Sequence, residues 1–387
     1  MKKLTCIILA LALLMCSAVA FADTTINPRE KRGIVPQAAG DNEVPEGISP
    51  TTGLTLDDLD VPEGYTGMAV TGRYMPMMAQ ISNEDGGVGK RAPWGAIYAD
   101  VVYETFIDHK DSATRLTFLF NDVIPDSVGP IRSMRVVHVW LREEWGAAYM
   151  FHGQQEYEGS NVVEEFKKLG HDYIYDDLLF NGWAGGKPWN KYFTTRSKLA
   201  SPNNKSVSAA GVYKLIPDDY VAPNHTFKFT DEEPEGDPAM SIRLAFRDGI
   251  SSNYGSNVVY NEELNAYQRY MRTVDSKEPQ LWGDKDDDAP VAFANVIVQF
   301  TPTEFNRRHD APIQRVIGKN NTPAEGNADF FMGGKHIAGY WKRESATSRT
   351  VYYGPDGEEI SLQRGKTLIV IFPDNDEYNS TISYSAN

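Results

Sequence analysis

The stretch from residue 98 to residue 153 carries most of the information about the fold. It reads YADVVYETFIDHKDSATRLTFLF over 98–120, GPIRSMRVVHVWLREEWG over 129–146 and AAYMFHG over 147–153. Two apolar runs flank a polar turn, as the strands of a hairpin do. Apolar residues at roughly helical spacing then run from Ser133, a favoured N-cap type, to Gly146, a typical helix stop. The stretch therefore predicts a hairpin, one helix and a further strand.

The turn that enters this helix carries Arg132 and Arg135. A helix N-terminus is the positive end of the helix dipole, where cations are disfavoured. A negative group is therefore expected beside the two arginines, either a protein carboxylate or a bound anion. We predict a site at the entry of this helix.

The first 22 residues have the features of an export signal. Two lysines precede an apolar run, and an Ala-Phe-Ala cleavage sequence ends at Ala22. The alternatives are a retained signal anchor and a lipoprotein acylated on Cys16, although Met15 stands where a small residue is expected. These features predict an extracytoplasmic protein that is secreted or attached to the cell envelope.

Composition excludes several classes of protein. Both cysteines lie within residues 1–22, so a chain cleaved after Ala22 has no thiol for catalysis or zinc binding. The formal net charge of −15 disfavours binding to nucleic acid. No later apolar run approaches the 18 or so residues of a membrane-spanning helix. We therefore expect no transmembrane segment after the signal.

The rest of the chain divides into three parts. Residues 23–62 are rich in proline and polar residues, which predicts a flexible tether. Residues 63–230 mix strands and helices, including a second helix over 160–169, and predict an N-terminal α/β domain. Residues 240–387 predict a C-terminal β-rich domain. The expected strands are 68–71, 77–82, 98–104, 113–120, 147–152, 242–246, 267–272, 294–300, 328–332, 337–342, 350–353, 359–362 and 368–372.

This order of elements predicts an α+β protein, in which a mixed α/β sheet with packed helices is followed by a mostly β part. A Gly-, Asn- and Pro-rich loop over 173–229 is long enough to be functional.

Several motifs resemble one known family. They are Ala99-Asp100-Val101-Val102-Tyr103-Glu104, Thr114-Arg115-Leu116, Gly129-Pro130-Ile131-Arg132-Ser133-Met134-Arg135, His152-Gly153, Tyr267-Gln268-Arg269, Asn295-Val296-Ile297-Val298, Gly339-Tyr340-Trp341-Lys342 and Gly365-Lys366-Thr367. Their order is similar to that of the YerB-like family of extracytoplasmic lipoproteins, known as domain of unknown function 3048. The resemblance implies an envelope-facing two-domain protein and no particular biochemistry. The chain departs from the family at Asn203, where members tend to carry histidine.

Three arginines are the first candidates for a functional site. Arg115 opens an apolar strand, and its guanidinium could converge with those of Arg132 and Arg135 if the helix packs on the sheet. Guanidinium groups bind carboxylate and phosphate through two parallel hydrogen bonds. Glu104 on the neighbouring strand is the expected internal partner. The cluster is then either a network that locks sheet to helix or an anion-binding site.

A second interpretation is catalytic. His152 ends a strand and could act as a general base, and with Ser133 and Glu104 it would complete a hydrolase set. Ser133 lacks the Gly-x-Ser-x-Gly context of a nucleophile elbow. A packed, hydrogen-bonded histidine is the alternative.

The loop aromatics Trp183 and Trp189 could supply contact area to a ligand or could anchor the loop on its own core. We include both with Asn203 among the candidate ligand-binding residues. The acidic run containing Asp284, Asp286 and Asp288 could hold calcium, but Ala289 stands where an EF-hand needs glycine, so a solvated turn is the alternative.

These observations predict an exported binding or accessory protein with an arginine-lined site for an anionic small molecule or envelope component. A hydrolase of envelope glycan or peptide using His152 is one alternative, and a structural docking protein is the other. No cofactor is expected. A lipid anchor at Cys16 is a further expectation.

Overall fold

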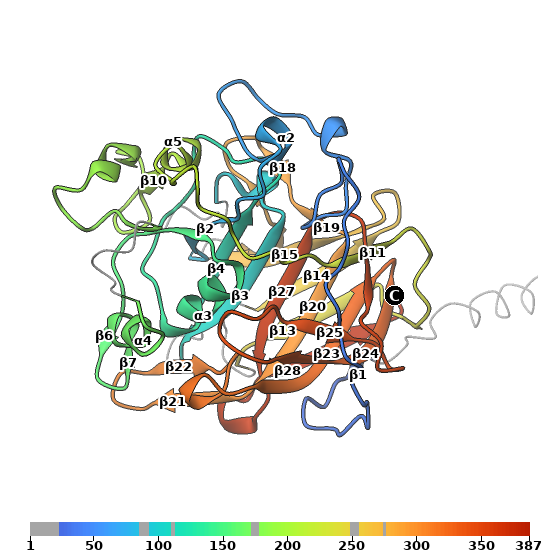
Figure 1. The fold of residues 1–387 in the computed structure, drawn as a ribbon. Coiled ribbons are helices and arrows are strands. Elements are labelled where there is room, and N and C mark those ends of the chain that lie inside the picture. The colour runs from blue at the N-terminus through green and yellow to red at the C-terminus, as the bar shows by residue number, and fades with distance from the viewer. Residues whose placement is uncertain (1–22, 85–92, 110–112, 172–177, 248–254, 274–275) are drawn as a thin grey trace, which may run out of the picture.

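The computed structural model describes residues 23–84, 93–109, 113–171, 178–247, 255–273 and 276–387. Figure 1 shows two sheets packed together, with short helices at one end of the larger sheet. The expected signal sequence and Cys16 lie outside the described residues. The protein is of the α+β class expected from the sequence, with mixed sheets and few helices.

The larger sheet has eleven strands. In spatial order they are β12 (Asp237–Pro238), β24 (Lys335–Arg343), β23 (Ala324–Met332), β20 (Asn295–Thr301), β27 (Thr367–Pro373), β3 (Val101–Asp108), β4 (Ala113–Phe120), β2 (Met77–Ser82), β5 (Ala148–Phe151) and β8 (Leu179–Asn181), with β25 (Val351–Tyr353) paired to β24.

The smaller sheet has seven strands. They are β1 (Thr24–Thr25), β28 (Thr381–Ser385), β13 (Ser241–Ala245), β14 (Ser256–Asn261), β15 (Ala266–Thr273) and β16 (Ser276–Leu281), with β19 (Ala292–Phe293) paired to β15.

Short strand pairs and helices complete the described structure. The pairs are β6 (Glu156–Tyr157) with β7 (Ser160–Asn161), β9 (Phe193–Thr195) with β10 (Lys205–Val207), β11 (Lys228–Thr230) with β26 (Ser361–Gln363), β17 (Gly283–Asp284) with β18 (Ala289–Pro290), and β21 (Thr303–Asn306) with β22 (Ala311–Gln314). The helices are α2 (Met68–Thr71), α3 (Val136–Trp145), α4 (Val162–Lys168), α5 (Ala209–Tyr213), η1 (Leu56–Asp58), η2 (Ala96–Tyr98), η3 (Pro188–Tyr192), η4 (Lys319–Asn321) and η5 (Asp376–Tyr378).

The two expected domains contribute to one sheet. Strand β27, near the C-terminus, lies parallel between β20 and β3, and its pairing with β3 begins at Thr367 opposite Val101. The regions 63–230 and 240–387 therefore do not form separate sheets. Such parallel pairing joins segments far apart in the chain and leaves no local signal in the sequence.

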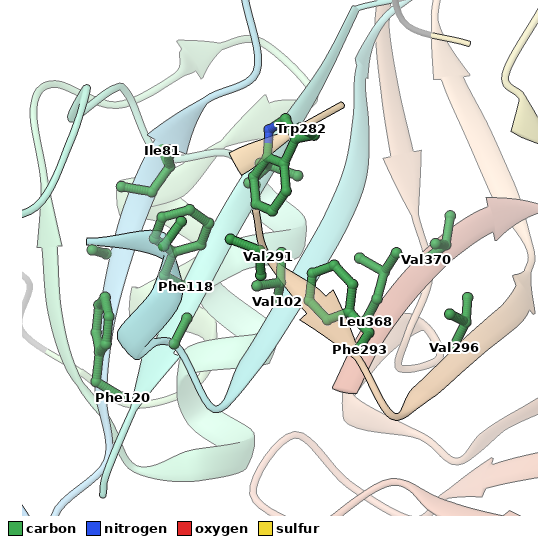
Figure 2. Packing of buried hydrophobic residues seen from close by; sticks show 14 of the residues in the cluster. Ile81, Val102, Phe118, Phe120, Trp282, Val291, Phe293, Val296, Leu368 and Val370 are labelled. Atoms are coloured by element: carbon green, nitrogen blue, oxygen red, sulfur yellow. The ribbon is translucent and has the colours of Figure 1, made fainter. Parts of the chain in front are cut away.

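Two hydrophobic clusters cover opposite faces of the larger sheet. One cluster joins it to the smaller sheet, and Figure 2 shows Phe118 and Leu368 of the larger sheet packed with Trp282 and Phe293. The other cluster joins it to α3 and α4. Because side chains alternate along a strand, neighbouring residues of β3 and β4 enter different clusters.

Residues 23–62 differ from the expected flexible tether. Strand β1 pairs with β28, and Arg32 forms an ion pair with Asp329 at 2.8 Å. Further along, Thr51 Oγ1 donates a hydrogen bond to Asp100 Oδ2 at 2.9 Å, and Thr52 Oγ1 donates to Asp122 Oδ2 at 2.7 Å. The polar side chains of this segment are therefore partners of buried carboxylates, and these contacts hold the segment against the core.

Several local predictions are confirmed, and strands β2 and β4 have the expected bounds 77–82 and 113–120. The β3–β4 hairpin is confirmed, α3 ends at Gly146 in the left-handed conformation, and α4 lies within the expected 160–169. The N-cap of α3 is Arg135 and not Ser133. The expected strand 68–71 is wrong, because this segment is the helix α2. A four-residue apolar run is too short for periodicity to separate helix from strand.

Candidate functional site

Glu104 and Arg115 lie on opposite faces of the β3–β4 hairpin. In the antiparallel register Glu104 is opposite Leu116, and Arg115 is opposite Thr105. Directly opposed residues share a face, and adjacent residues on one strand do not. Glu104 therefore faces the smaller sheet, whereas Arg115 faces α3. The expected pairing of Glu104 with the arginine cluster is wrong for this reason.

Glu104 pairs with Arg269 of β15. Glu104 Oε2 lies 2.6 Å from Arg269 Nη2, and both side chains are completely buried. The other carboxylate oxygen accepts hydrogen bonds from Thr114 Oγ1 at 2.7 Å and from Asn83 Nδ2 at 3.2 Å. The pair joins the two sheets. Removing either partner would leave the other charge buried and unpaired, which strongly destabilises a folded protein.

Two of the three arginines donate to the backbone carbonyl of Ser133. Arg115 Nη1 donates to the Ser133 carbonyl oxygen, and Arg135 Nη1 donates to the same oxygen at 3.4 Å. Arg135 also donates to the Met134 carbonyl at 3.2 Å. The arginine cluster, defined as Arg115, Arg132 and Arg135, is thus gathered where the chain enters α3.

His138 stabilises the first turn of α3, next to this cluster. Its Nδ1 accepts a hydrogen bond from the backbone N–H of Arg135 at 2.9 Å, so its Nε2 carries the proton and donates to Thr105 Oγ1 at 2.9 Å. Burial holds the pKa of His138 well below its usual value, and the charges of Arg115 and Arg135 lower that pKa further. His138 is therefore a neutral cap that positions Arg135.

Glu84 is the carboxylate that faces the arginine cluster. Its Oε1 lies 3.0 Å from Arg132 Nη2, and its Oε2 accepts a hydrogen bond from Asn203 Nδ2 at 3.0 Å. Burial by itself would raise the pKa of Glu84, but Arg132, Asn203 and Arg115 together lower it. Glu84 is consequently ionised at neutral pH and compensates the positive charge of Arg132.

Arg135 has a different environment. Within the described residues it makes no ion pair, and its buried Nε has no hydrogen-bond partner. Burial lowers the pKa of Arg135 to about 10, a shift that Tyr157 opposes and the neighbouring charge of Arg132 increases. The guanidinium remains protonated at neutral pH. It is a partly buried cation that a bound anion would stabilise.

His152 and Trp183 lie next to the cluster. The backbone N–H of His152 donates to the Arg132 carbonyl at 2.9 Å, and the His152 ring meets the Trp183 ring edge to face at a centroid distance of 5.3 Å. Burial and the charges of Lys205 and Arg132 lower the pKa of His152. The imidazole is therefore neutral at pH 7 and can exchange hydrogen bonds with a ligand.

The expected hydrolase set is not assembled. Across the described part of the chain, no hydrogen bond joins Ser133 Oγ to His152. Glu104 is engaged with Arg269 on the far face of the sheet, so it cannot orient the imidazole. A nucleophile needs a base within hydrogen-bond reach, and that base needs an orienting group.

The two loop tryptophans have different surroundings. Trp189 Nε1 donates to the Asn181 carbonyl at 3.0 Å, and its ring packs edge to face on Phe180 at 5.6 Å. Trp189 therefore anchors the loop to β8. Trp183 is 73% exposed, which is unusual for so large an apolar side chain.

The acidic turn is held by protein donors. Asp284 accepts hydrogen bonds from the backbone N–H groups of Ile97 and Asp286, and Asp286 forms an ion pair with Arg196 at 2.5 Å. Asp288 adopts the left-handed conformation within this turn. In the described residues no group of three His, Cys, Asp or Glu side chains is placed to hold a metal ion.

The sequence analysis missed Glu84. It lies two residues beyond the end of β2, whose last residue, Ser82, is opposite Arg115 in the sheet. The carboxylate is visible in the sequence, but the pairing of β2 with β4 is not. Asn203 was found because it replaces a family histidine, and it lies beside Glu84.

Comparison with known proteins supports the resemblance seen in the motifs. Residues 65–217 match the family profile "Protein of unknown function (DUF3048) N-terminal domain", and residues 244–369 match the corresponding C-terminal domain. The chain belongs to the DUF3048 family. The first profile of this family includes the arginine cluster, and the second includes Arg269.

The match extends beyond the DUF3048 profiles to YerB of Bacillus subtilis, both in sequence and in structure. A Bacillus subtilis (strain 168) protein described as "Putative lipoprotein YerB" is 24% identical over 286 residues, which are 73% of this chain and 77% of the relative. The crystal structure of YerB protein from Bacillus subtilis aligns with a TM-score of 0.64 at 18% identity, covering 87% of this chain and 99% of that chain. The structural likeness shows that the fold is shared.

No helix in the described residues is long and apolar enough to cross a membrane.

Proposed function

We propose that this protein is a non-enzymatic binding or accessory protein of the cell envelope, and that its arginine cluster binds an anionic ligand. The envelope location is inferred from the export signal expected in residues 1–22 and from the description of the Bacillus relative as a lipoprotein. The ligand class is inferred from the charges around the entry of α3.

The observation that carries the proposal is the environment of Arg135. Arg135 donates to the Ser133 carbonyl beside Arg115 and has no ion pair within the described residues, whereas its neighbour Arg132 is paired with Glu84. Partly buried charges are normally paired, because an unpaired one has lost water without gaining a partner. An anion in contact with Arg135 and Arg132 would supply the missing partner.

The alternatives fit the geometry less well. Arg115 is buried and hydrogen-bonded to backbone, as a structural lock would be, but Arg132 and Arg135 are half-buried near the ends of β2 and β5. The hydrolase alternative lacks an assembled nucleophile and base. Anion binding needs only the observed positions of Arg132 and Arg135.

The test is a titration with inorganic phosphate at low ionic strength, followed by calorimetry and by the melting temperature. Phosphate should bind and raise the melting temperature more than chloride at equal ionic strength. Arg135→Ala should abolish that increase while leaving the ligand-free melting temperature nearly unchanged or slightly higher, because an uncompensated buried charge is removed.

Lys342→Ala is the matched control. It removes one positive charge from β24, at the other end of the sheet, where Lys342 pairs with Glu344 at 2.7 Å. The control should bind phosphate like the unmodified protein. The proposal is wrong if phosphate has no effect on the unmodified protein, or if Arg135→Ala mainly destabilises the fold, as loss of a structural lock would.

A further inference from the structure

Trp183 is held rigidly although it is exposed. Asn181 Oδ1 accepts hydrogen bonds from the backbone N–H groups of both Gly153 and Trp183, each at 2.9 Å. The indole also packs against the His152 ring at an interplanar angle of 76°. A mobile loop residue would be exposed for lack of contacts, whereas this one is fixed with 73% of its surface in water. Such an arrangement presents an aromatic surface to a partner.

The exposed indole is connected directly to the arginine cluster. The segment from Arg132 to Met134 runs beside the segment that contains His152 and Gly153, with hydrogen bonds of 2.9 Å from His152 N to the Arg132 carbonyl and 3.0 Å from Met134 N to the Gly153 carbonyl. Trp183 is tied to the second segment through Asn181. The indole is therefore carried on a segment tied to the one that holds Arg132, which is the arrangement that a ligand contacting both groups needs.

Two polar groups beside the arginine cluster, His152 and Asn203, suit hydroxyl groups. His152 is half-buried and neutral at pH 7 because burial lowers its pKa. Asn203 Oδ1 is buried without a hydrogen-bond partner, while the Nδ2 of the same amide donates to Glu84. A buried acceptor without a donor is costly, and a simple oxyanion such as sulfate cannot supply that donor.

We infer that the ligand is an anionic carbohydrate, with its carboxylate or phosphate on Arg132 and Arg135, its hydroxyl groups at His152 and Asn203, and one face of its ring on Trp183. The inference rests on the proposed anion-binding function and adds the class of ligand. The apolar C–H face of a pyranose packs on an aromatic ring, and its hydroxyl groups are both donors and acceptors. An acidic group alone would leave Trp183 without a role.

The test compares five probes in the same calorimetric titration: inorganic phosphate, glucose 6-phosphate, an oligosaccharide of glucuronic acid, a short acidic peptide, and glucose. At least one of the two acidic sugars should bind about tenfold more tightly than phosphate, as expected for covering one aromatic side chain. Neutral glucose should bind too weakly to measure. The difference between the two acidic sugars shows whether the natural anion is a phosphate or a carboxylate.

Two kinds of variant test carbohydrate recognition and anion binding separately. Trp183→Ala should remove the tenfold advantage of the acidic sugar and leave phosphate binding unchanged, and Trp183→Phe should restore part of it. Leu264→Ala, at an exposed position between β14 and β15 of the other sheet, is the control and should change neither. Arg135→Ala should abolish binding of phosphate and of the acidic sugar.

Each outcome has one meaning. If phosphate binds and neither acidic sugar binds more tightly, or if Trp183→Ala has no effect on sugar binding, the carbohydrate inference is wrong and the anion-binding function stands. If a short acidic peptide binds more tightly than either acidic sugar, the ligand class is wrong. If no probe binds, both proposals fail.

Discussion

The two faces of the β3–β4 hairpin hold arginines in opposite electrostatic situations. On one face Arg269 is completely buried and lies 2.6 Å from the carboxylate of Glu104. On the other face Arg132 and Arg135 are half-buried, and Glu84 pairs with Arg132 alone. The difference indicates that an arginine of this hairpin region stabilises the fold on one face and, in the function proposed above, binds a ligand on the other.

The comparison also separates stability from binding. The Glu104–Arg269 pair connects the two sheets and is sealed from water, so its loss should affect folding. The arginine cluster lies near the ends of β2 and β5, on a segment hydrogen-bonded to the one that meets the exposed Trp183, so its loss should affect ligands. Three substitutions can break or sharpen this contrast.

The largest effect is expected from Arg269→Met. The substitution leaves Glu104 charged, buried and without its partner, which costs about 3–5 kcal/mol in the free energy of unfolding. Urea denaturation followed by tryptophan fluorescence measures the loss. The double variant Glu104→Gln with Arg269→Met should recover most of it, because no unpaired charge remains. A loss below about 1 kcal/mol in Arg269→Met would contradict the role of this pair as a lock.

An intermediate effect is expected from His138→Gln, and it depends on pH. The pKa of His138 is lowered in the folded state by burial, Arg115 and Arg135, whereas in the unfolded chain it is about 6.5. Below that pH the unfolded state binds more protons than the folded state, so acid reduces stability. Below pH 6 the free energy of unfolding should therefore fall more steeply with each pH unit in the unmodified protein than in His138→Gln, by up to about 1.4 kcal/mol per unit.

Glutamine is the matched replacement because it can accept from the Arg135 N–H and donate to Thr105 as His138 does. Denaturation at pH 7, pH 6 and pH 5 gives the two slopes. Equal slopes for the two proteins would show that His138 is not the titrating group.

The smallest effect on stability is expected from Glu84→Gln. Its side chain is 32% exposed, so loss of the pair with Arg132 should change the free energy of unfolding by less than about 1 kcal/mol. The Glu84 carboxylate competes with phosphate for Arg132, so this substitution should tighten phosphate binding several-fold in a titration. Weaker binding would mean that Glu84 is needed to orient Arg132.

Local sequence patterns were sufficient for the parts of the site that lie close together in the chain. The GPIRSMR segment, the stop at Gly146 and the following strand were all predicted from short-range signals, and they bring Arg132, Arg135 and His152 together. The register of the hairpin was harder to predict. A bulge between Phe106 and Asp108 shifts the pairing, so the faces of Glu104 and Arg115 could not be assigned from the turn alone.

The class of the fold, the hairpin, the helices α3 and α4 and the arginine cluster follow from the sequence, because periodicity and helix-end signals act over a few residues. Only the tertiary structure decides that β27 joins both regions in one sheet, that Arg269 reaches Glu104 across 165 residues, and that Glu84 faces Arg132. These contacts depend on which distant strands become neighbours, and the hydrophobic pattern of a buried strand does not specify its partner.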